Sequence, residues 1–185
     1  DFKNGNFLLP DELSFDLFKK LIGYSLVNKN IISNGSNEAS EIYQDDFVNT
    51  HDALTMLPNR VFLLNKIESL LKAAPNNQQK FAVLFIDLDG FKAINDAGGH
   101  STGDLVLKEV ARRLIKNTRA TDIVSRHGGD EFVILLPHIA NKEDVEIVAN
   151  KILAIINEPF YINHETWAIS ASIGVAAYPY DGETA

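Results

Sequence analysis

The feature that most constrains the fold is a nearly continuous apolar run from Phe81 to Leu88. A single charged residue, Asp87, interrupts the run near its end. A strand with apolar side chains on both faces has to be covered on both faces, as happens to a central strand in a sheet that packs against helices. The run therefore predicts the central strand of a domain that mixes helices with a sheet.

The segments around this run supply the other elements. Apolar periodicity and end signals predict a helix from Pro58 to Pro75, a helix opened by Gly103-Asp104, a hairpin from Asp122 to Pro137, a helix capped by Asn141 and stopped by Pro159, and a last strand from Trp167 to Tyr178. The order βααββαβ predicts an α/β (α+β) fold in which helices flank a sheet that contains antiparallel strands.

The hairpin carries two adjacent acids, Asp130 and Glu131, directly after the pair Gly128-Gly129. Glycines permit a tight turn, but such a turn needs only one acid or Asn. Two adjacent carboxylates repel each other unless a cation or a proton lies between them. The pattern therefore has two interpretations, a solvated Gly-Gly-Asp turn or a site for a metal ion and a phosphate.

Asp87 favours the second interpretation, because an ionised side chain in a strand built for burial is costly unless it is paired or bound to a cation. If this strand lies beside the hairpin, Asp87, Asp130 and Glu131 converge at one edge of the sheet. Three carboxylates and the backbone carbonyl of Leu88 would suit Mg²⁺, which substrate phosphates usually complete. The predicted substrate is a nucleoside triphosphate. Asp89 is better explained as a strand-end residue that caps a turn.

The polar segment after the central strand also has two interpretations. The backbone N–H groups of the turn Gly90-Phe91-Lys92 could surround phosphates, or the turn could be an ordinary connection from strand to helix. Asn95 and Asp104 lie in stretches rich in turn residues, and such residues usually cap helices. An Asn amide with a nearby carboxylate can also bind the hydrogen-bonding edge of guanine.

Composition excludes several classes of function. The net charge of -8 argues against broad binding to nucleic acid or to an anionic membrane, so no nucleic-acid partner is expected. The chain has no cysteine, which excludes disulfides, thiolate zinc sites and cysteine nucleophiles. No apolar run approaches the roughly 20 residues that span a bilayer.

Four sequence blocks, taken together and in order, identify the chain as a member of a known family. The blocks are Asp52–Arg60 (DALTMLPNR), Asp87–Asp96 (DLDGFKAIND), Gly99-His100 with Gly103-Asp104, and Gly128–Phe132 (GGDEF). They resemble the GGDEF domain family, the diguanylate cyclases, over about residues 52 to 185. The resemblance implies a fold akin to the nucleotidyl cyclase and polymerase palm. It also implies a reaction that converts two GTP into cyclic di-GMP and two pyrophosphates.

The same resemblance implies a role for each motif residue. Asp87, Asp130 and the Leu88 carbonyl would hold Mg²⁺ or Mn²⁺, and Glu131 would be a further ligand or help to deprotonate the ribose 3′-hydroxyl. Asn95 and Asp104 would bind guanine. The residues at the phosphates would be Phe91, Lys92, Gly128 and Gly129. Each domain would offer one GTP site, so the resemblance implies a homodimer in catalysis. The intact acids favour an active enzyme over a catalytically silent module that binds GTP or cyclic di-GMP.

A second site is suggested by Arg119 and Asp122, which match the family's R-x-x-D motif just before the hairpin. Arg can bind a phosphate or a guanine edge through two hydrogen bonds, and Asp can accept from guanine N–H groups. As a bare pattern the two residues are explained by a surface ion pair. Within this family they imply inhibition by the product, cyclic di-GMP.

Four side chains near the motifs receive structural predictions. Asp52 and Arg60 are expected to form an ion pair around the first helix, and His127 is expected to face solvent from a strand. Trp167 is expected to belong to the core.

The domain limits follow from these motifs. Residues 1–50 are predicted to be a helical connector or the tail of an upstream sensory module, and residues 51–185 the GGDEF domain. The family usually continues with a last helix that contacts the GTP phosphates, and the sequence stops before that segment, so we expect a C-terminal end that is cut off, disordered or absent. Glu158-Pro159-Phe160 is similar to members that carry a following EAL phosphodiesterase domain. We expect a cytoplasmic domain, which a full-length protein could attach to a membrane.

Overall fold

The computed structural model of the chain describes residues 7–8, 49–77 and 79–181. Its elements are β1 (Phe7–Leu8), α3 (Arg60–Asn77), β2 (Phe81–Asp89), α4 (Phe91–Asn117), β3 (Ile123–Gly128), β4 (Glu131–Leu136), α5 (Lys142–Asn157), β5 (Phe160–Ile162), β6 (Glu165–Trp167) and β7 (Ser170–Tyr178). One sheet has the strand order β1-β7-β2-β4-β3, and β5 pairs with β6 separately. The predicted mixture of helices with an antiparallel-containing sheet is confirmed. The order differs in detail, because α3 precedes β2 and the hairpin β5–β6 was not expected.

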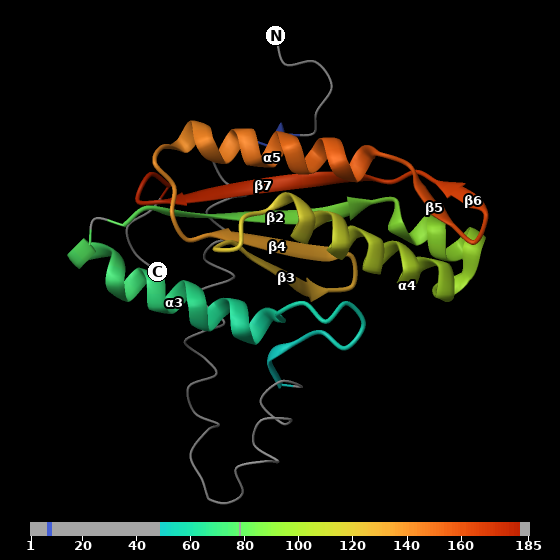
Figure 1. Cartoon of the computed structure of the whole chain (residues 1–185), viewed down its shortest axis with the longest axis horizontal. Helices are drawn as coiled ribbons and strands as arrows, with labels where there is room; N and C mark the ends of the chain where they lie inside the picture. Colours follow the sequence, from blue (N-terminus) through green and yellow to red (C-terminus); the bar gives the residue numbers. More distant parts are fainter. Residues whose placement is uncertain (1–6, 9–48, 78, 182–185) are drawn as a thin grey trace, which may run out of the picture.

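Strand β2 is the centre of the domain. It is antiparallel to β4 on one side and to β7 on the other. Alternate β2 side chains enter two different cores: Leu84 and Ile86 pack with α4 and α5, whereas Phe81 and Val83 pack with α3. Figure 1 shows α5 and α3 on opposite sides of the strands. The predicted central strand, covered on both faces, is therefore present.

Both predicted ends of the first helix are wrong, because α3 begins after Pro58 and continues through Pro75. Asn59 begins the helix: its Oδ1 accepts hydrogen bonds from the backbone N–H of Val61 at 2.9 Å and of Phe62 at 3.2 Å. Pro75 lies close to the C-terminal end of α3. A proline so near the end removes one hydrogen bond without breaking the body of the helix.

Helix α5 follows its sequence signals closely. The Oδ1 atom of Asn141 accepts a hydrogen bond from the backbone N–H of Asp144 at 2.9 Å, which confirms the predicted cap. The helix ends at Asn157, shortly before Pro159, as predicted. These two signals fix where α5 begins and ends.

Helix α4 is longer than predicted, because it begins at Phe91 and not at Gly103. Gly99 lies inside it with φ 78° and ψ 164°, a conformation that is not helical. Two helical segments therefore meet at a kink. The glycines of this stretch have low helix propensity, which is why the sequence favours a loop there. We call residues 91–98 the first segment of α4 and residues 100–117 the second segment.

The last predicted strand is shorter than expected, because β7 begins at Ser170 and Trp167 ends the hairpin β5–β6. Asn163 and His164 make the turn of that hairpin, with φ of 53° and 67°. Two positive φ values are typical of the tight turns that join antiparallel strands. The chain thus reverses direction before it enters the sheet.

The predicted N-terminal connector, residues 1–50, lies outside the described residues except for residues 7–8 and 49–50. Strand β1 is parallel to β7, with Phe7 opposite Ile173. In the described part of the chain, no helix has both the length and the apolar character that crossing a membrane requires.

Candidate functional site

The candidate site lies where the end of β2 meets the turn between β3 and β4. Asp87 is paired with Glu131 across the β2–β4 ladder. The backbone N–H of Leu88 donates to the carbonyl oxygen of Asp130 at 3.4 Å. The fold therefore brings the strand-end acid next to the two hairpin acids, which are distant from it in the sequence.

The surroundings of Asp87 disfavour the ionised form of its carboxyl group. Burial raises the pKa of Asp87 above its ordinary value, and the carboxylates of Asp130 and Asp89 raise it further. Asp89 differs, because the hydroxyls of Ser170 and Ser172 donate hydrogen bonds to it at 3.1 Å and 2.9 Å. Asp89 thus has a structural role, with donors on β7 in place of the expected turn. A cation beside Asp87 would relieve its repulsion.

The expected cluster of three carboxylates is not formed. Among the residues that the structure describes, no three Asp, Glu, His or Cys side chains are grouped to hold a metal ion. Glu131 is the direct partner of Asp87 in the β2–β4 ladder, but the two are not grouped with Asp130 into a single three-ligand cluster. The pair Asp87 and Asp130, with the carbonyl of Leu88, still fits Mg²⁺, because that ion binds one or two carboxylates and keeps several waters.

Arg126, which no sequence prediction singled out, fixes the hairpin turn. Its Nε and Nη2 donate to the carbonyl oxygen of Gly129 at 3.1 Å and 2.7 Å, and its Nη1 donates to Asp52 Oδ1 at 3.0 Å. Burial raises the pKa of Asp52, but hydrogen bonds from Thr55 and then from Arg126 outweigh it and hold the pKa below its ordinary value. The partner of Asp52 is therefore Arg126 and not the predicted Arg60. The signal available in the sequence was the position of Arg126, a charged residue just before the Gly128-Gly129 turn and the apolar strand that follows it.

His127 is half-buried and does not face solvent as predicted. Its ring meets Phe85 edge-on, with 5.7 Å between the ring centroids and 67° between the planes. Its Nδ1 atom has no hydrogen-bond partner among the described residues. Burial and then the positive charge of Arg60 lower the pKa of His127 to about 4. The prediction failed because strand alternation places His127 on the face of the sheet that α3 partly covers.

The N-terminus of α4 lies directly after the end of β2. Gly90 is in the left-handed conformation, with φ 78°, and no side chain caps the helix. Uncapped N–H groups at a helix N-terminus suit a phosphate. The side chain of Lys92 is exposed, but that of Phe91 is 8% exposed and belongs to the main core. The prediction that Phe91 binds substrate is therefore restricted to its backbone, because its side chain completes the apolar face of α4.

Asn95 and Asp104 lie on opposite sides of the kink in α4. Asn95 is half-buried and Asp104 is exposed. A Cβ atom added to Gly103 would overlap the Oδ1 atom of Asn95 and would lie 3.1 Å from Phe91 Cζ. The amide of Asn95 therefore packs on the bare Cα of Gly103. The relative placement of the two predicted guanine-binding residues depends on how α4 bends.

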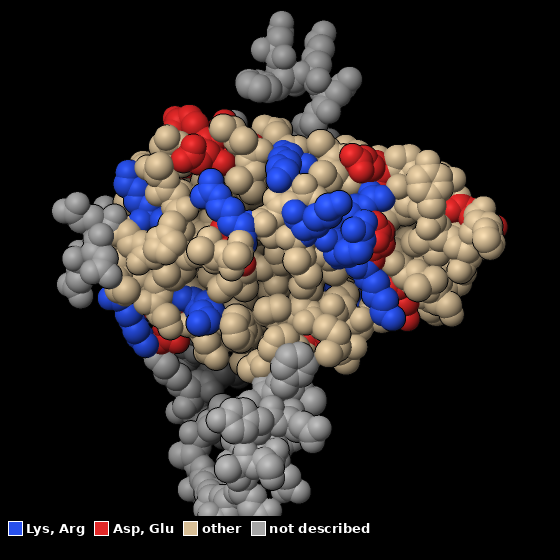
Figure 2. All heavy atoms as spheres, viewed as in Figure 1, with Lys and Arg blue, Asp and Glu red and all other residues tan. Residues whose placement is uncertain are grey.

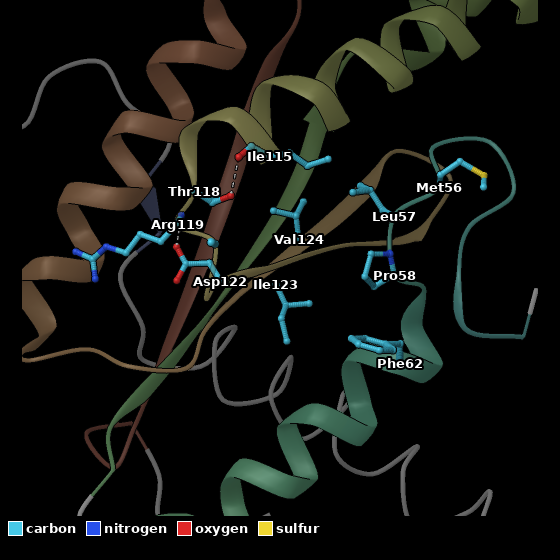
Figure 3. A pocket seen from close by; sticks show the side chains of 11 residues that line it. Met56, Leu57, Pro58, Phe62, Ile115, Thr118, Arg119, Asp122, Ile123 and Val124 are labelled. Atoms are coloured by element: carbon cyan, nitrogen blue, oxygen red, sulfur yellow. Dashed lines mark hydrogen bonds between the residues drawn. The ribbon is translucent and has the colours of Figure 1, made fainter. Parts of the chain in front are cut away.

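Arg119 and Asp122 form a tight turn between α4 and β3. The Asp122 carboxylate accepts the backbone N–H of Arg119 at 2.8 Å, and the backbone N–H of Asp122 donates to the Arg119 carbonyl at 3.0 Å. Figure 3 shows the Arg119 guanidinium extending away from this carboxylate towards α5. Both residues line a cavity of about 580 Å³, together with apolar side chains such as Met56 and Phe62. The geometry leaves the guanidinium and the carboxylate separate from each other.

The face that carries α4 and α5 has charges of both signs. Figure 2 shows Lys and Arg side chains gathering over this face, with acidic side chains beside them. Glu109 forms ion pairs with Arg112 at 2.6 Å and with Arg113 at 3.2 Å. These pairs neutralise part of the positive charge, in a chain whose net charge is -8.

Comparison with known proteins adds to this geometry. The family described as "Diguanylate cyclase, GGDEF domain" matches residues 49–185. The bifunctional diguanylate cyclase/cyclic di-GMP phosphodiesterase MucR of Pseudomonas aeruginosa is 49% identical over 134 residues, which are 72% of this chain and 19% of that protein. The response regulator PleD of Caulobacter vibrioides is 39% identical over 135 residues, which are 72% of this chain and 30% of that protein.

A solved structure gives the corresponding result for the fold. The GGDEF domain of TpbB (YfiN) from Pseudomonas aeruginosa superposes with a TM-score of 0.70 at 41% identity, covering 72% of this chain and 78% of that domain. The match to the curated relatives spans less than a third of their own length. Their names therefore describe much larger proteins than the region compared.

Proposed function

Because this chain belongs to the GGDEF domain family of diguanylate cyclases, we propose that it condenses two GTP molecules into cyclic di-GMP. In each half of the reaction, the 3′-oxygen of one GTP attacks the α-phosphorus of the other. The bond from that phosphorus to the β-phosphate oxygen breaks, and pyrophosphate leaves. The observation that carries the proposal is Asp87 beside Asp130, with the pKa of Asp87 raised, because such a pair calls for a cation.

Asp87, Asp130 and the carbonyl of Leu88 would hold Mg²⁺, or Mn²⁺ in its place. Such an ion, when bound, offsets phosphate charge and lowers the pKa of the attacking hydroxyl. Glu131 is the partner of Asp87 across the β2–β4 ladder, which supports a role in which it would accept the proton of the 3′-hydroxyl or serve as a further ligand. Arg126 keeps the turn in position through the Gly129 carbonyl.

The first segment of α4 would bind the nucleotide. Its uncapped N-terminus and the exposed Lys92 supply N–H groups and positive charge for the phosphates, and the open turn at Gly128-Gly129 leaves room for them. Asn95 and Asp104 would accept and donate hydrogen bonds at the guanine edge. An amide and a carboxylate match the donors and the carbonyl of guanine, which adenine does not present.

Two copies of the chain would have to face each other, because one domain supplies one GTP site and the reaction joins two nucleotides. Catalysis should therefore depend on a homodimer. The turn Arg119–Asp122 would bind cyclic di-GMP and slow the reaction, with Arg119 gripping a phosphate or a guanine edge. The separation of its guanidinium from Asp122 leaves both groups available to a ligand.

In a longer protein, this domain would act in the cytoplasm under the control of an upstream sensor, with an EAL domain as a further neighbour. The relative MucR carries both cyclase and phosphodiesterase in its name. Membrane attachment would then be a property of the longer protein and not of the described domain.

The test is to incubate the full chain with GTP and Mg²⁺ and to measure cyclic di-GMP by liquid chromatography. We expect product from the wild-type chain and none from Asp130→Ala, whose fold should remain intact by circular dichroism. Binding of GTP to a dimer without any product would contradict the cyclase and favour the silent regulatory module.

A further inference from the structure

We propose that Trp167, at the end of the hairpin β5–β6, is a positioning residue for the guanine-binding segment of α4. The inference rests on the proposed function, because the residues it positions are the proposed guanine contacts. Three observations carry it: the kink in α4, the contact of Trp167 with the kink, and the anchoring of the hairpin on the far side of the kink.

The kink in α4 makes the first segment a separate arm. Gly99 departs from helical geometry, with φ 78° and ψ 164°, so the regular helix ladder is interrupted there. The hydroxyl of Thr102 donates to the carbonyl oxygen of Gly98 at 2.7 Å and joins the two sides. A joint held by so few bonds needs further support if the arm is to keep one direction.

Trp167 supplies a contact on the first segment. A Cβ atom added to Gly98 would lie 2.8 Å from Trp167 Cη2 and 2.9 Å from Thr102 Cβ, so the indole edge packs directly on the glycine backbone. The indole Nε1 is buried and has no hydrogen-bond partner among the described residues. Shape and packing, and not a hydrogen bond, therefore fix the indole against α4.

The hairpin that carries Trp167 is anchored on the second segment of α4. The Arg113 guanidinium lies 3.7 Å over the ring of Phe160, at the start of β5. It also donates to the carbonyl oxygens of Ile155, Glu158 and Pro159 at 2.8 Å, 2.6 Å and 2.7 Å. Phe160 and Trp167 are paired across the hairpin. Strand β5 is thus tied to α4 after the kink, and the facing strand β6 contacts α4 before it. The hairpin therefore links the two segments of α4 and holds the angle between them.

The angle of this joint sets the proposed guanine site. Asn95 lies before the kink and packs on Gly103 after it, beside Asp104. A change in the angle moves Asn95 relative to Asp104 while the acids on β2 and β4 stay in place. Loss of the indole should therefore weaken guanine binding and leave the chemical step intact.

The chain contains one tryptophan, so its fluorescence reports on this contact directly. We expect a saturable change in fluorescence when 3′-deoxy-GTP and Mg²⁺, which cannot form product, are added to Arg119→Ala, where the proposed product site is disabled. Asn95→Ala should move the midpoint to higher concentration. Calorimetry run in parallel separates the outcomes. Binding without a fluorescence change overturns the inference alone, whereas no binding overturns the proposed function and the inference with it.

Steady-state kinetics give the second test. Trp167→Ala should raise the KM for GTP about tenfold, with kcat changed less than about twofold, because misplacement of a binding group affects affinity. It should also reduce the preference for GTP over ITP, which lacks the 2-amino group. Trp167→Phe should restore most of the affinity, since no hydrogen bond of the indole is lost.

Two further variants make the kinetic result specific. Tyr161→Ala, on the same hairpin but 80% exposed, should leave KM unchanged. Gly98→Ala keeps the indole but forces it away from α4, and should raise KM if Trp167→Ala does not fold. The inference would be overturned if Trp167→Ala kept the wild-type KM and the wild-type preference for GTP over ITP, even with full cyclase activity. If Trp167→Ala does not fold, the same result in Gly98→Ala would overturn it.

Discussion

The two ends of strand β3 hold their acids in opposite ways. Beyond its last residue, Asp130 lies close to Asp87, and this proximity together with burial raises the pKa of Asp87. Just before its first residue, the carboxylate of Asp122 accepts the backbone N–H of Arg119 at 2.8 Å, so it has a hydrogen-bond donor without any ligand. The difference indicates which end a cation would stabilise: the acids at the first end repel each other, whereas the acid at the second end already has a hydrogen-bond donor.

The largest effect is expected when the repulsion is removed at its source. Asp87→Asn should lower kcat by about 10²- to 10³-fold, the usual consequence of losing a charge-stabilising group. The same change should raise the melting temperature, because the raised pKa means that folding disfavours the charged form at neutral pH. Cyclase assays and thermal unfolding at pH 7.5 measure both.

Asp89→Asn is the matched control for that change. It replaces one of the two carboxylate oxygens that accept from Ser170 and Ser172 with an NH2 donor, so the melting temperature should fall and not rise. If both variants shifted the melting temperature in the same direction, the contrast between an unbalanced and a satisfied acid would be wrong.

The next effect is on the support of the acid-bearing turn. Arg126→Ala should lower the free energy of unfolding by about 2 kcal/mol, because its side chain is 11% exposed and its loss leaves the Gly129 carbonyl without its side-chain donors and Asp52 without its charged partner. Urea unfolding measures the change. Arg112→Ala, whose side chain is 59% exposed, should cost less than about 1 kcal/mol. Equal losses in the two variants would refute the special role of Arg126.

A smaller effect is expected at the other end of β3. Arg119→Ala should raise the concentration of cyclic di-GMP needed for half-inhibition about tenfold, the worth of a charge-assisted hydrogen bond, and leave kcat and the melting temperature unchanged. Initial rates measured across a product series test this. A wild-type rate that is insensitive to saturating product would contradict the proposed inhibition outright.

The smallest effect depends on pH. The pKa of His127 is lowered from 6.5 to about 4 in the folded chain, so the unfolded chain takes up a proton first as the pH falls. Stability should therefore be full above pH 6.5 and decline towards pH 4. His127→Phe should flatten this decline, measured as the melting temperature at pH 7.5 and at pH 5. His100→Gln, at an exposed position on α4, should leave the decline as it is.

The sequence predicts what depends on local patterns. The apolar run around Leu84 indicated a central strand, Asn141 indicated a helix start, and the Gly-Gly pair indicated a hairpin with acids at its tip; each is present. Side-chain partners depend on which elements become neighbours, and local patterns do not contain that information. The pairing of Asp52 with Arg126 and the burial of His127 therefore appeared only in the folded chain.

The candidate site shows the same division. The approach of Asp87 to Asp130 followed from placing a strand beside a hairpin, which the pattern suggested. The expected cluster of three carboxylates is not formed among the described residues, although Glu131 is paired with Asp87 across the ladder. The sequence did not predict the kink in α4. Its glycines favour a loop in isolation, but contacts from Trp167 and Asn95 hold them in a helical element.

The hydrogen bonds around Arg126 connect the β3–β4 turn to the segment that enters the domain at residues 50–59. The backbone of Asn59 donates to Thr50, Pro58 accepts from the Arg126 backbone, and Arg126 holds both Asp52 and Gly129. A twist applied at the start of the domain would therefore reach the Gly129 carbonyl through a short series of stiff links, without passing through the core. A displacement at residue 50 would in this way be transmitted to the turn that bears the acids.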